Sequence, residues 1–214
     1  MAQIKNIFLA ALMLACCANA GAQDEAAAAQ EEQLLTLQQI AAASAGMKSL
    51  ICDFEQTKVM SMLNDKLVST GKMYYRRDGC LRWEYAPPAE YTFILNNKKA
   101  LMLAGGKRIS DAKMNRFFQE MIGVMMNGIN GSGLTDKNTF EVSYQRSTEQ
   151  FEVVLLPVRR EVKKMFASIT LTFNLKDYTT DRIALKESNG DVTTIRLLEK
   201  QLNVEIDDAK FNTN

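Results

Sequence analysis

From Leu50 onward, apolar and polar side chains alternate along most of the chain, and Thr, Val, Tyr and Phe are frequent. A period of two places successive side chains on opposite faces of an extended strand, so this pattern predicts β-strands. Most connections between these segments are short and carry Gly, Asn or Asp, as in antiparallel hairpins. The expected strands lie near 49–60, 66–77, 81–86, 90–96, 99–104, 106–110, 139–146, 150–157, 165–175, 180–188 and 192–198.

Two segments follow a helical period instead. Between Asp24 and Ala45, apolar residues recur at intervals of three and four beneath a polar face. The same period in Lys113–Asn127 predicts a second amphipathic helix. Because a twisted sheet of this many strands curls towards a barrel, we expect a mainly β fold with some α structure. The expected architecture is a curled, half-open antiparallel β-barrel covered by an N-terminal helix and a mid-chain helical lid.

The apolar stripe of the mid-chain helix is rich in methionine and has two interpretations. One is ordinary core packing. The other is an adaptable surface that repacks around apolar ligands, since Met is unbranched and flexible. We favour the second, because the glycine-rich segment Gly128–Gly133 follows and a moving lid needs such a loop. The candidate ligand contacts on this helix are Phe117, Phe118, Met121 and Met125.

The chain begins with the layout of a secretory signal peptide. One Lys precedes an apolar run from Ile7 to Cys17, which is shorter than the ~20 residues needed to span a bilayer. Small residues offer cleavage after Ala20 or Ala22, so we assign 1–22 to the signal and 23–214 to one soluble periplasmic domain. An alternative is a weak lipobox ending at Cys16, whose acylation would anchor the protein in a membrane.

Composition excludes several classes of function. The net charge is +1, so the chain has no global attraction for nucleic acids. It has no histidine, and only Cys52 and Cys80 follow the predicted signal, which removes His-based triads and the common zinc sites. We therefore expect no cofactor, no metal and no enzymatic activity. A hydrolase built on carboxylates ranks last, because no paired acids are predicted to face the apolar side of the sheet.

Side-chain alternation allows the first hairpin to be phased. Leu50, Cys52 and Phe54 share one face of the first strand, which must be the inner, apolar face. A turn near residues 61–64 then places Cys52 opposite Met73 and Leu50 opposite Tyr75. On this phasing the two cysteines that follow the signal lie too far apart for a disulfide, so we expect free thiols.

The next turn, expected at Asp78–Cys80, fixes the third strand. It pairs Arg77 with Leu81, Tyr75 with Trp83 and Met73 with Tyr85. The candidate inner wall, which would contact an apolar ligand, then consists of Phe54, Met73, Tyr75, Leu81, Trp83 and Tyr85.

Three arginines of this region receive different interpretations. Arg76 and Arg82 fall on the outer face, where cross-strand charge pairing on a solvated surface is expected. Arg77 falls on the inner face at the edge of the wall. It is either a snorkelling rim residue or a donor to carbonyl groups of the lid or of a ligand.

Three sequence motifs resemble those of a known family. Phe54-Glu55-Gln56 is similar to an early-strand F-x-Q motif, and Asp207–Phe211 to a C-terminal D-x-x-x-F element. Between them, Gly71, Arg77, the Arg82-Trp83 pair and Pro88 stand in the order of the family's central block. The chain thus resembles the periplasmic outer-membrane lipoprotein carriers, the LolA family.

The resemblance implies a half-open curled sheet closed by helices around a cavity for acyl chains. It also implies that Arg77 latches the lid, and that the family proline after this arginine is replaced by Asp78, which could pair with Arg77 or cap the turn. The implied partners are acylated lipoproteins, an inner-membrane lipoprotein-releasing transporter and an outer-membrane acceptor lipoprotein.

The leading hypothesis is therefore a monomeric carrier that shuttles lipoproteins between the two membranes. The alternatives are a lipid-anchored acceptor of the same fold, which requires acylated Cys16, and a regulatory domain that senses lipids or lipoproteins.

Overall fold

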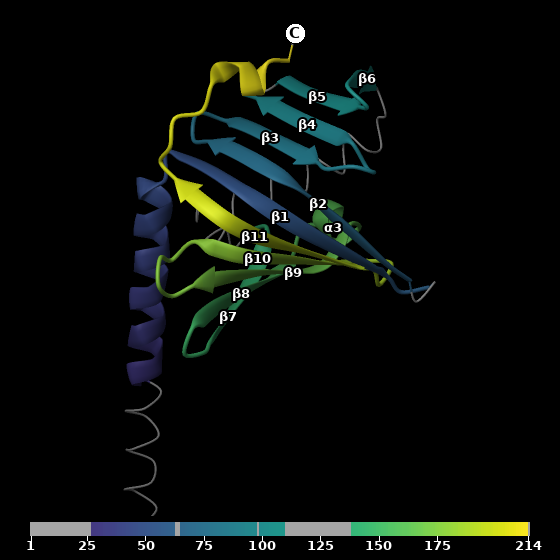
Figure 1. Ribbon diagram of the computed structural model, residues 1–214. Helices are drawn as coiled ribbons and strands as arrows, with labels where there is room; N and C mark the ends of the chain where they lie inside the picture. The colour runs from purple at the N-terminus through teal and green to yellow at the C-terminus, as the bar shows by residue number, and fades with distance from the viewer. Residues whose placement is uncertain (1–26, 63–64, 98, 110–137, 214) are drawn as a thin grey trace, which may run out of the picture. The chain divides into compact units, whose positions relative to one another are not determined.

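The computed structural model describes residues 27–62, 65–97, 99–109 and 138–213 (Figure 1). Its contacts divide the chain into two units, Met1–Gln39 and Ile40–Asn214. A helix over 27–46 begins in the first unit and ends in the second, which confirms the expected N-terminal helix. Within the first unit the Thr36 hydroxyl donates to the Glu32 carbonyl at 2.8 Å, a bond along the helix axis.

The second unit contains one antiparallel sheet, in which the described residues form eleven strands. Along the sheet they lie in the order β6-β5-β4-β3-β2-β1-β11-β10-β9-β8-β7. In sequence they are β1 Ser49–Met60, β2 Asp65–Arg76, β3 Cys80–Tyr85, β4 Tyr91–Asn96, β5 Lys99–Ala104, β6 Lys107–Ile109, β7 Phe140–Arg146, β8 Gln150–Pro157, β9 Phe166–Asn174, β10 Thr180–Glu187 and β11 Val192–Leu202.

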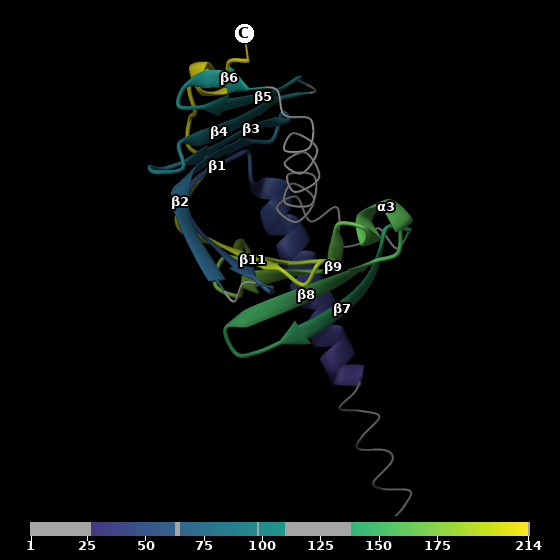
Figure 2. The ribbon, with the colours of Figure 1, turned by 90° about the vertical axis from the view of Figure 1, so that its right-hand side faces the viewer.

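Two meanders, β1–β6 and β7–β11, therefore meet where β1 pairs with β11. The two edge strands β6 and β7 are consecutive in sequence, so residues 110–139 connect one edge of the sheet to the other. Figure 2 shows how strongly the sheet is curled between these edges. The predicted mainly β fold with an open, curled sheet is confirmed. The predicted mid-chain helix lies outside the described residues, and the lid stays a prediction.

The first hairpin has the predicted register, with Cys52 opposite Met73 and Leu50 opposite Tyr75. The predicted register of the second hairpin, β2 with β3, was wrong by two residues, since Tyr75 lies opposite Leu81 and Met73 opposite Trp83. The turn begins at Arg77 rather than at Asp78, because Gly79 has φ of 90° and takes the left-handed last position of a three-residue loop. A shift of two keeps every side chain on its predicted face.

One face of the sheet is apolar and buried from β5 to β8. Aromatic and branched side chains occupy alternate positions on each strand, as expected for strands with one face in a core. They include Phe54, Met73, Tyr75, Leu81, Trp83, Phe93, Met102, Phe151, Val153, Ile169, Leu171, Ile183, Leu185 and Ile195.

The opposite face of β1–β4 is covered by the C-terminal segment, which includes the 3-10 helix η2, Asp208–Phe211. Phe211 is buried against Cys80 and Ile206. The expectation of a solvated face around Arg76 and Arg82 was thus wrong. Arg76 pairs with Asp208 at 2.5 Å, and Arg82 donates to the Lys210 carbonyl at 3.4 Å, because the returning chain offers both arginines acceptors.

Both described cysteines are buried free thiols, as predicted. Cys52 lies on the apolar face beside Met73, and Cys80 lies under the C-terminal segment opposite Arg76. Burial raises the pKa of the Cys52 thiol to about 12, so the reactive thiolate is scarce at neutral pH.

Candidate functional site

The six described residues of the predicted inner wall come from β1, β2 and β3 and lie together. Phe54, Met73, Tyr75, Leu81 and Trp83 are each at most 1% exposed. Tyr85 is less deeply buried and lies at the end of β3. The other four candidate contacts, Phe117, Phe118, Met121 and Met125, lie outside the described residues.

Three rings of this wall form an aromatic cluster, which we define as Phe54, Trp83 and Tyr85. Phe54 stacks on Trp83 with ring centroids 4.2 Å apart and planes inclined by 28°. Tyr85 meets Phe54 edge to face at 5.2 Å and 84°. Such offset and perpendicular arrangements are the favoured ones for aromatic pairs, so the cluster is a well-packed apolar surface.

The polar atoms of the cluster lie at one side of it. The Tyr85 hydroxyl donates to Oε1 of Gln56 at 2.9 Å. Burial raises the pKa of Tyr85 to about 12, and its contacts with Trp83 and Gln56 oppose that shift. The indole nitrogen of Trp83 lies near this hydroxyl without a hydrogen bond of normal geometry. The rest of the cluster presents only carbon to its neighbours, which suits hydrocarbon and offers no group for chemistry.

Gly71 makes the cluster possible. It lies opposite Phe54 on β1 and opposite Tyr85 on β3. A Cβ at this position would lie 2.5 Å from the Phe54 ring and 2.1 Å from the Glu84 carbonyl oxygen. The ring therefore lies directly over the β2 backbone, where only glycine leaves room. Neither this packing nor the Gln56 bond was predicted; the signal was a glycine opposite an aromatic residue in the β1–β2 register.

Arg77 binds the end of the N-terminal helix. Its Nε donates to the Met47 carbonyl at 2.7 Å, and its Nη2 donates to the Ser44 carbonyl. Its backbone N–H donates to the Lys48 carbonyl at 2.9 Å. Carbonyls in the last turn of a helix lack partners within the helix, so a guanidinium is well suited to bind them. Sequence reasoning expected carbonyl acceptors, but placed them on the mid-chain lid or on a ligand.

Asp78 does not pair with Arg77. Its carboxylate pairs with Nε of Arg76 at 2.9 Å instead. Burial opposes ionisation of Asp78, but the hydrogen bonds from Arg76 and Cys80 prevail and lower its pKa. Asp78 therefore ties the turn to the outer face and leaves Arg77 available for the helix end.

The acids near this wall lie on the outer face and are paired. A groove of about 610 Å³ there is lined by Asp53, Glu55 and Glu84 among other residues. Asp53 pairs with Lys72 at 2.8 Å, and Glu84 pairs with Arg82 at 2.8 Å. The pKa of Glu84 is lowered by its bond from Arg82, so this carboxyl stays ionised and is no general acid. In the described part of the chain, no cluster of acids and cysteines could hold a metal ion.

The comparison with protein families agrees with this geometry. Residues 45–214 match the family described as "Outer membrane lipoprotein carrier protein LolA". The chain belongs to the LolA family. Among the motif residues on which the resemblance rested, Phe54, Gly71 and Trp83 lie together in the aromatic cluster, whereas Arg77 binds the end of the N-terminal helix.

Solved structures with a similar fold are distant in sequence. An uncharacterized conserved protein from Thermus thermophilus has a TM-score of 0.51 and 10% identity, over 84% of this chain and 92% of that chain. The LolA superfamily protein NE2245 from Nitrosomonas europaea gives 0.45 and 9%, over 84% and 97%. MucB in the Pseudomonas aeruginosa MucA/MucB complex gives 0.48 and 11%, over 84% and 60%. At 10% identity, the likeness to the Thermus thermophilus protein concerns the fold alone.

A search of curated proteins found none that matches the chain in sequence. Among the residues that the structure describes, no helix is both long and apolar enough to cross a bilayer.

Proposed function

We propose that this LolA-family protein is a periplasmic carrier that binds the acyl chains of lipoproteins against the buried apolar face of its sheet. It would receive them from an inner-membrane transporter and pass them to an acceptor at the outer membrane. The observation that carries the proposal is the continuous apolar face around the aromatic cluster, in a chain of this family.

The size of the apolar face suits the energetics of the task. Burying one methylene group contributes about 0.8 kcal/mol, so the acyl chains of a lipoprotein are held in a membrane by tens of kcal/mol. A carrier must offer comparable apolar surface and still release its cargo. Buried side chains from β5 to β8 supply that surface without a charged residue among them.

Entry of a ligand requires the apolar face to open. Trp83 and Tyr75 are 0% exposed, so an acyl chain reaches them only if a covering element moves. We assign this role to residues 110–139, which join the two edges of the sheet and contain the predicted methionine-rich lid helix. The C-terminal segment already covers part of the other face, which favours placing the lid on the apolar face.

Trp83 makes the proposal testable, because it is the only tryptophan of the chain and belongs to the aromatic cluster. Titration with a triacylated lipopeptide is expected to shift its fluorescence emission with saturation. The matched control is the same peptide without acyl groups, which should produce no shift. Equal responses to the two peptides, or none to either, would contradict acyl-chain binding.

Native mass spectrometry of protein purified from membranes provides a second measurement. Bound acylated species are expected, and removing them with detergent should restore the lipopeptide response. The mass of the mature N-terminus distinguishes a carrier from an anchored acceptor. Cleavage after Ala20 or Ala22 supports the carrier, whereas an acylated Cys16 supports the acceptor.

A further inference from the structure

One end of the sheet combines exposed apolar side chains with exposed basic side chains. Three connections meet there: the tip of the β1–β2 hairpin, the β10–β11 turn, and the segment between β8 and β9 that contains α3, Arg160–Lys163. Hydrogen bonds join them in series. The Ser61 hydroxyl donates to the Asn189 carbonyl at 3.1 Å, and the Ser188 hydroxyl donates to the Lys163 carbonyl at 2.8 Å.

The positive charge comes from residues 159–164, which contain two arginines and two lysines against one acid, Glu161. All four basic side chains are exposed, and none is within ion-pair distance of an acid among the described residues. Their charge is therefore available to an external partner. We define the basic cluster as Arg159, Arg160, Lys163 and Lys164.

The acids of the neighbouring turn do not neutralise this cluster. Glu187 and Asp191 pair with Lys58 at 2.8 and 3.5 Å. Lys58 is on β1, so these two carboxylates share one cation of the hairpin, and the three groups together carry one negative charge. Among the residues that the structure describes, the net positive charge of three on residues 159–164 exceeds the single negative charge left at this turn.

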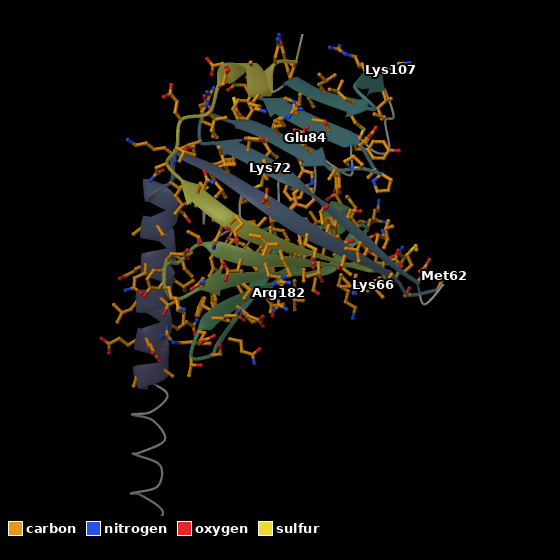
Figure 3. The ribbon with its side chains drawn as sticks, viewed as in Figure 1. Met62, Lys66, Lys72, Glu84, Lys107 and Arg182 are labelled. Atoms are coloured by element: carbon orange, nitrogen blue, oxygen red, sulfur yellow. The ribbon has the colours of Figure 1, made fainter. Side chains whose placement is uncertain are left out.

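Apolar side chains border the basic cluster and the hairpin tip. Leu156 and Val158, which lead into the cluster, are 42% and 49% exposed. At the hairpin tip Met62 is 92% exposed, and Figure 3 shows it projecting from the end of the sheet near Lys66. Isolated exposed apolar residues are common on proteins, but several of them at the same end of the sheet as a cluster of exposed cations mark an interaction surface.

We propose that this end of the sheet docks onto an anionic lipid bilayer. Exposed cations are attracted to the negative surface potential of such a membrane, and protruding apolar tips can enter its interfacial region. A protruding side chain such as Met62 fits a deformable surface better than the preformed pocket of a protein partner. None of these residues belongs to the aromatic cluster, so docking and acyl-chain binding use separate parts of the molecule.

The test compares binding to vesicles of phosphatidylglycerol and phosphatidylcholine with binding to vesicles of phosphatidylcholine alone, using protein exported from cells that express the full chain. The wild type is expected to bind the anionic vesicles selectively and to lose binding in high salt. The double variant K163E/K164E should lower this partitioning by at least about 20-fold, since each surface cation contributes several-fold. Met62→Ser should lower it by about 10-fold, through lost apolar insertion.

The matched control is K99E/K176E, which changes the charge by the same amount. Both lysines are exposed and lie at the β4–β5 and β9–β10 turns, at the other end of the sheet. The control should bind as the wild type does, and all variants should bind the triacylated lipopeptide normally. An equal loss in the two double variants, or no selective binding by the wild type, overturns the proposal. If the wild type shows no selective binding to anionic vesicles, an acidic protein surface becomes the better candidate for the partner. The fluorescence titration of Trp83 tests acyl-chain binding independently of this result.

Discussion

Gly71 supports the aromatic cluster because it has no side chain. In a Gly71→Ala variant the new Cβ would lie 2.5 Å from the Phe54 ring and 2.1 Å from the Glu84 oxygen, so ring or backbone must shift. We expect a loss of about 2 kcal/mol or more in the free energy of unfolding, as for overpacked cores. Gly46→Ala is the control, because nothing lies within 4 Å of its added Cβ and alanine favours the helix. Urea unfolding measures both; equal effects would show that Gly71 is not crowded.

Tyr85 makes stability sensitive to alkaline pH. Its pKa is raised from 10.0 to about 12 by burial, so the folded protein holds this proton more tightly than the unfolded chain. The stabilisation is complete below pH 10 and is lost as pH rises towards about 12. Tyr85→Phe cannot titrate and should show a smaller decline over this window. Parallel wild-type and variant curves from urea unfolding at pH 9 to 12 would contradict the assignment.

At the level of single residues, the sequence predicted faces better than exact partners. Strict alternation keeps Phe54, Met73 and Trp83 on one side for any register error of an even number of residues, such as the error of two found here. The register itself depends on which residue takes the left-handed position of a turn, and Gly79 allowed two placements. The bond from Arg77 to the Ser44 and Met47 carbonyls was beyond prediction, because it depends on where the N-terminal helix ends.

The C-terminal segment shows the limit of prediction at the level of elements. The D-x-x-x-F element was noticed, yet its place on the outer face of β1–β4 depends on contacts between residues far apart in sequence. Phe211 is buried beside Cys80, and the Arg76 guanidinium lies 5.0 Å from the centre of its ring. On the outer face of the sheet, this segment therefore forms a second, small hydrophobic core.

Phe211→Ala should loosen that core selectively. Removing a buried Phe costs about 3 kcal/mol or more, and the loss falls on the segment that covers Cys80. We expect faster alkylation of Cys80 by iodoacetamide, with little change at Cys52 on the opposite face. Peptide mapping by mass spectrometry measures both rates in one sample, so Cys52 serves as the internal control. Equal acceleration at both thiols would indicate global unfolding instead.

At the scale of the whole molecule, the eleven strands were predictable because each alternates along its length and ends at a turn signal. The helix α3 was missed, since four residues are too few for a helical period to emerge from the sequence. The curl of the sheet was expected from strand number alone. The junction of β1 with β11 was not, because it pairs residues such as Phe54 and Leu197 from opposite ends of the chain.

Arg77 has a separate role in the proposed transport. Arg77 ties the β2–β3 turn to the end of the N-terminal helix through the Met47 carbonyl at 2.7 Å. If the proposed carrier opens to admit cargo, a bond of this kind resists opening and helps to release the acyl chains as the molecule closes. Arg77→Leu removes both side-chain bonds but keeps an apolar side chain at this position. We therefore expect it to bind triacylated lipopeptide as well as the wild type or more tightly.

Release is where the variant should fail. Transfer of bound lipopeptide to acceptor vesicles is expected to be at least about 10-fold slower for Arg77→Leu, the kinetic equivalent of losing one charge-assisted hydrogen bond. Arg77→Lys keeps the charge but lacks the planar fork of a guanidinium, which donates to both carbonyls. Its transfer rate should therefore fall between those of the wild type and Arg77→Leu. Unchanged thermal unfolding would confirm that the fold is intact. A normal transfer rate in Arg77→Leu would remove this arginine from the mechanism and leave it the role of capping the helix.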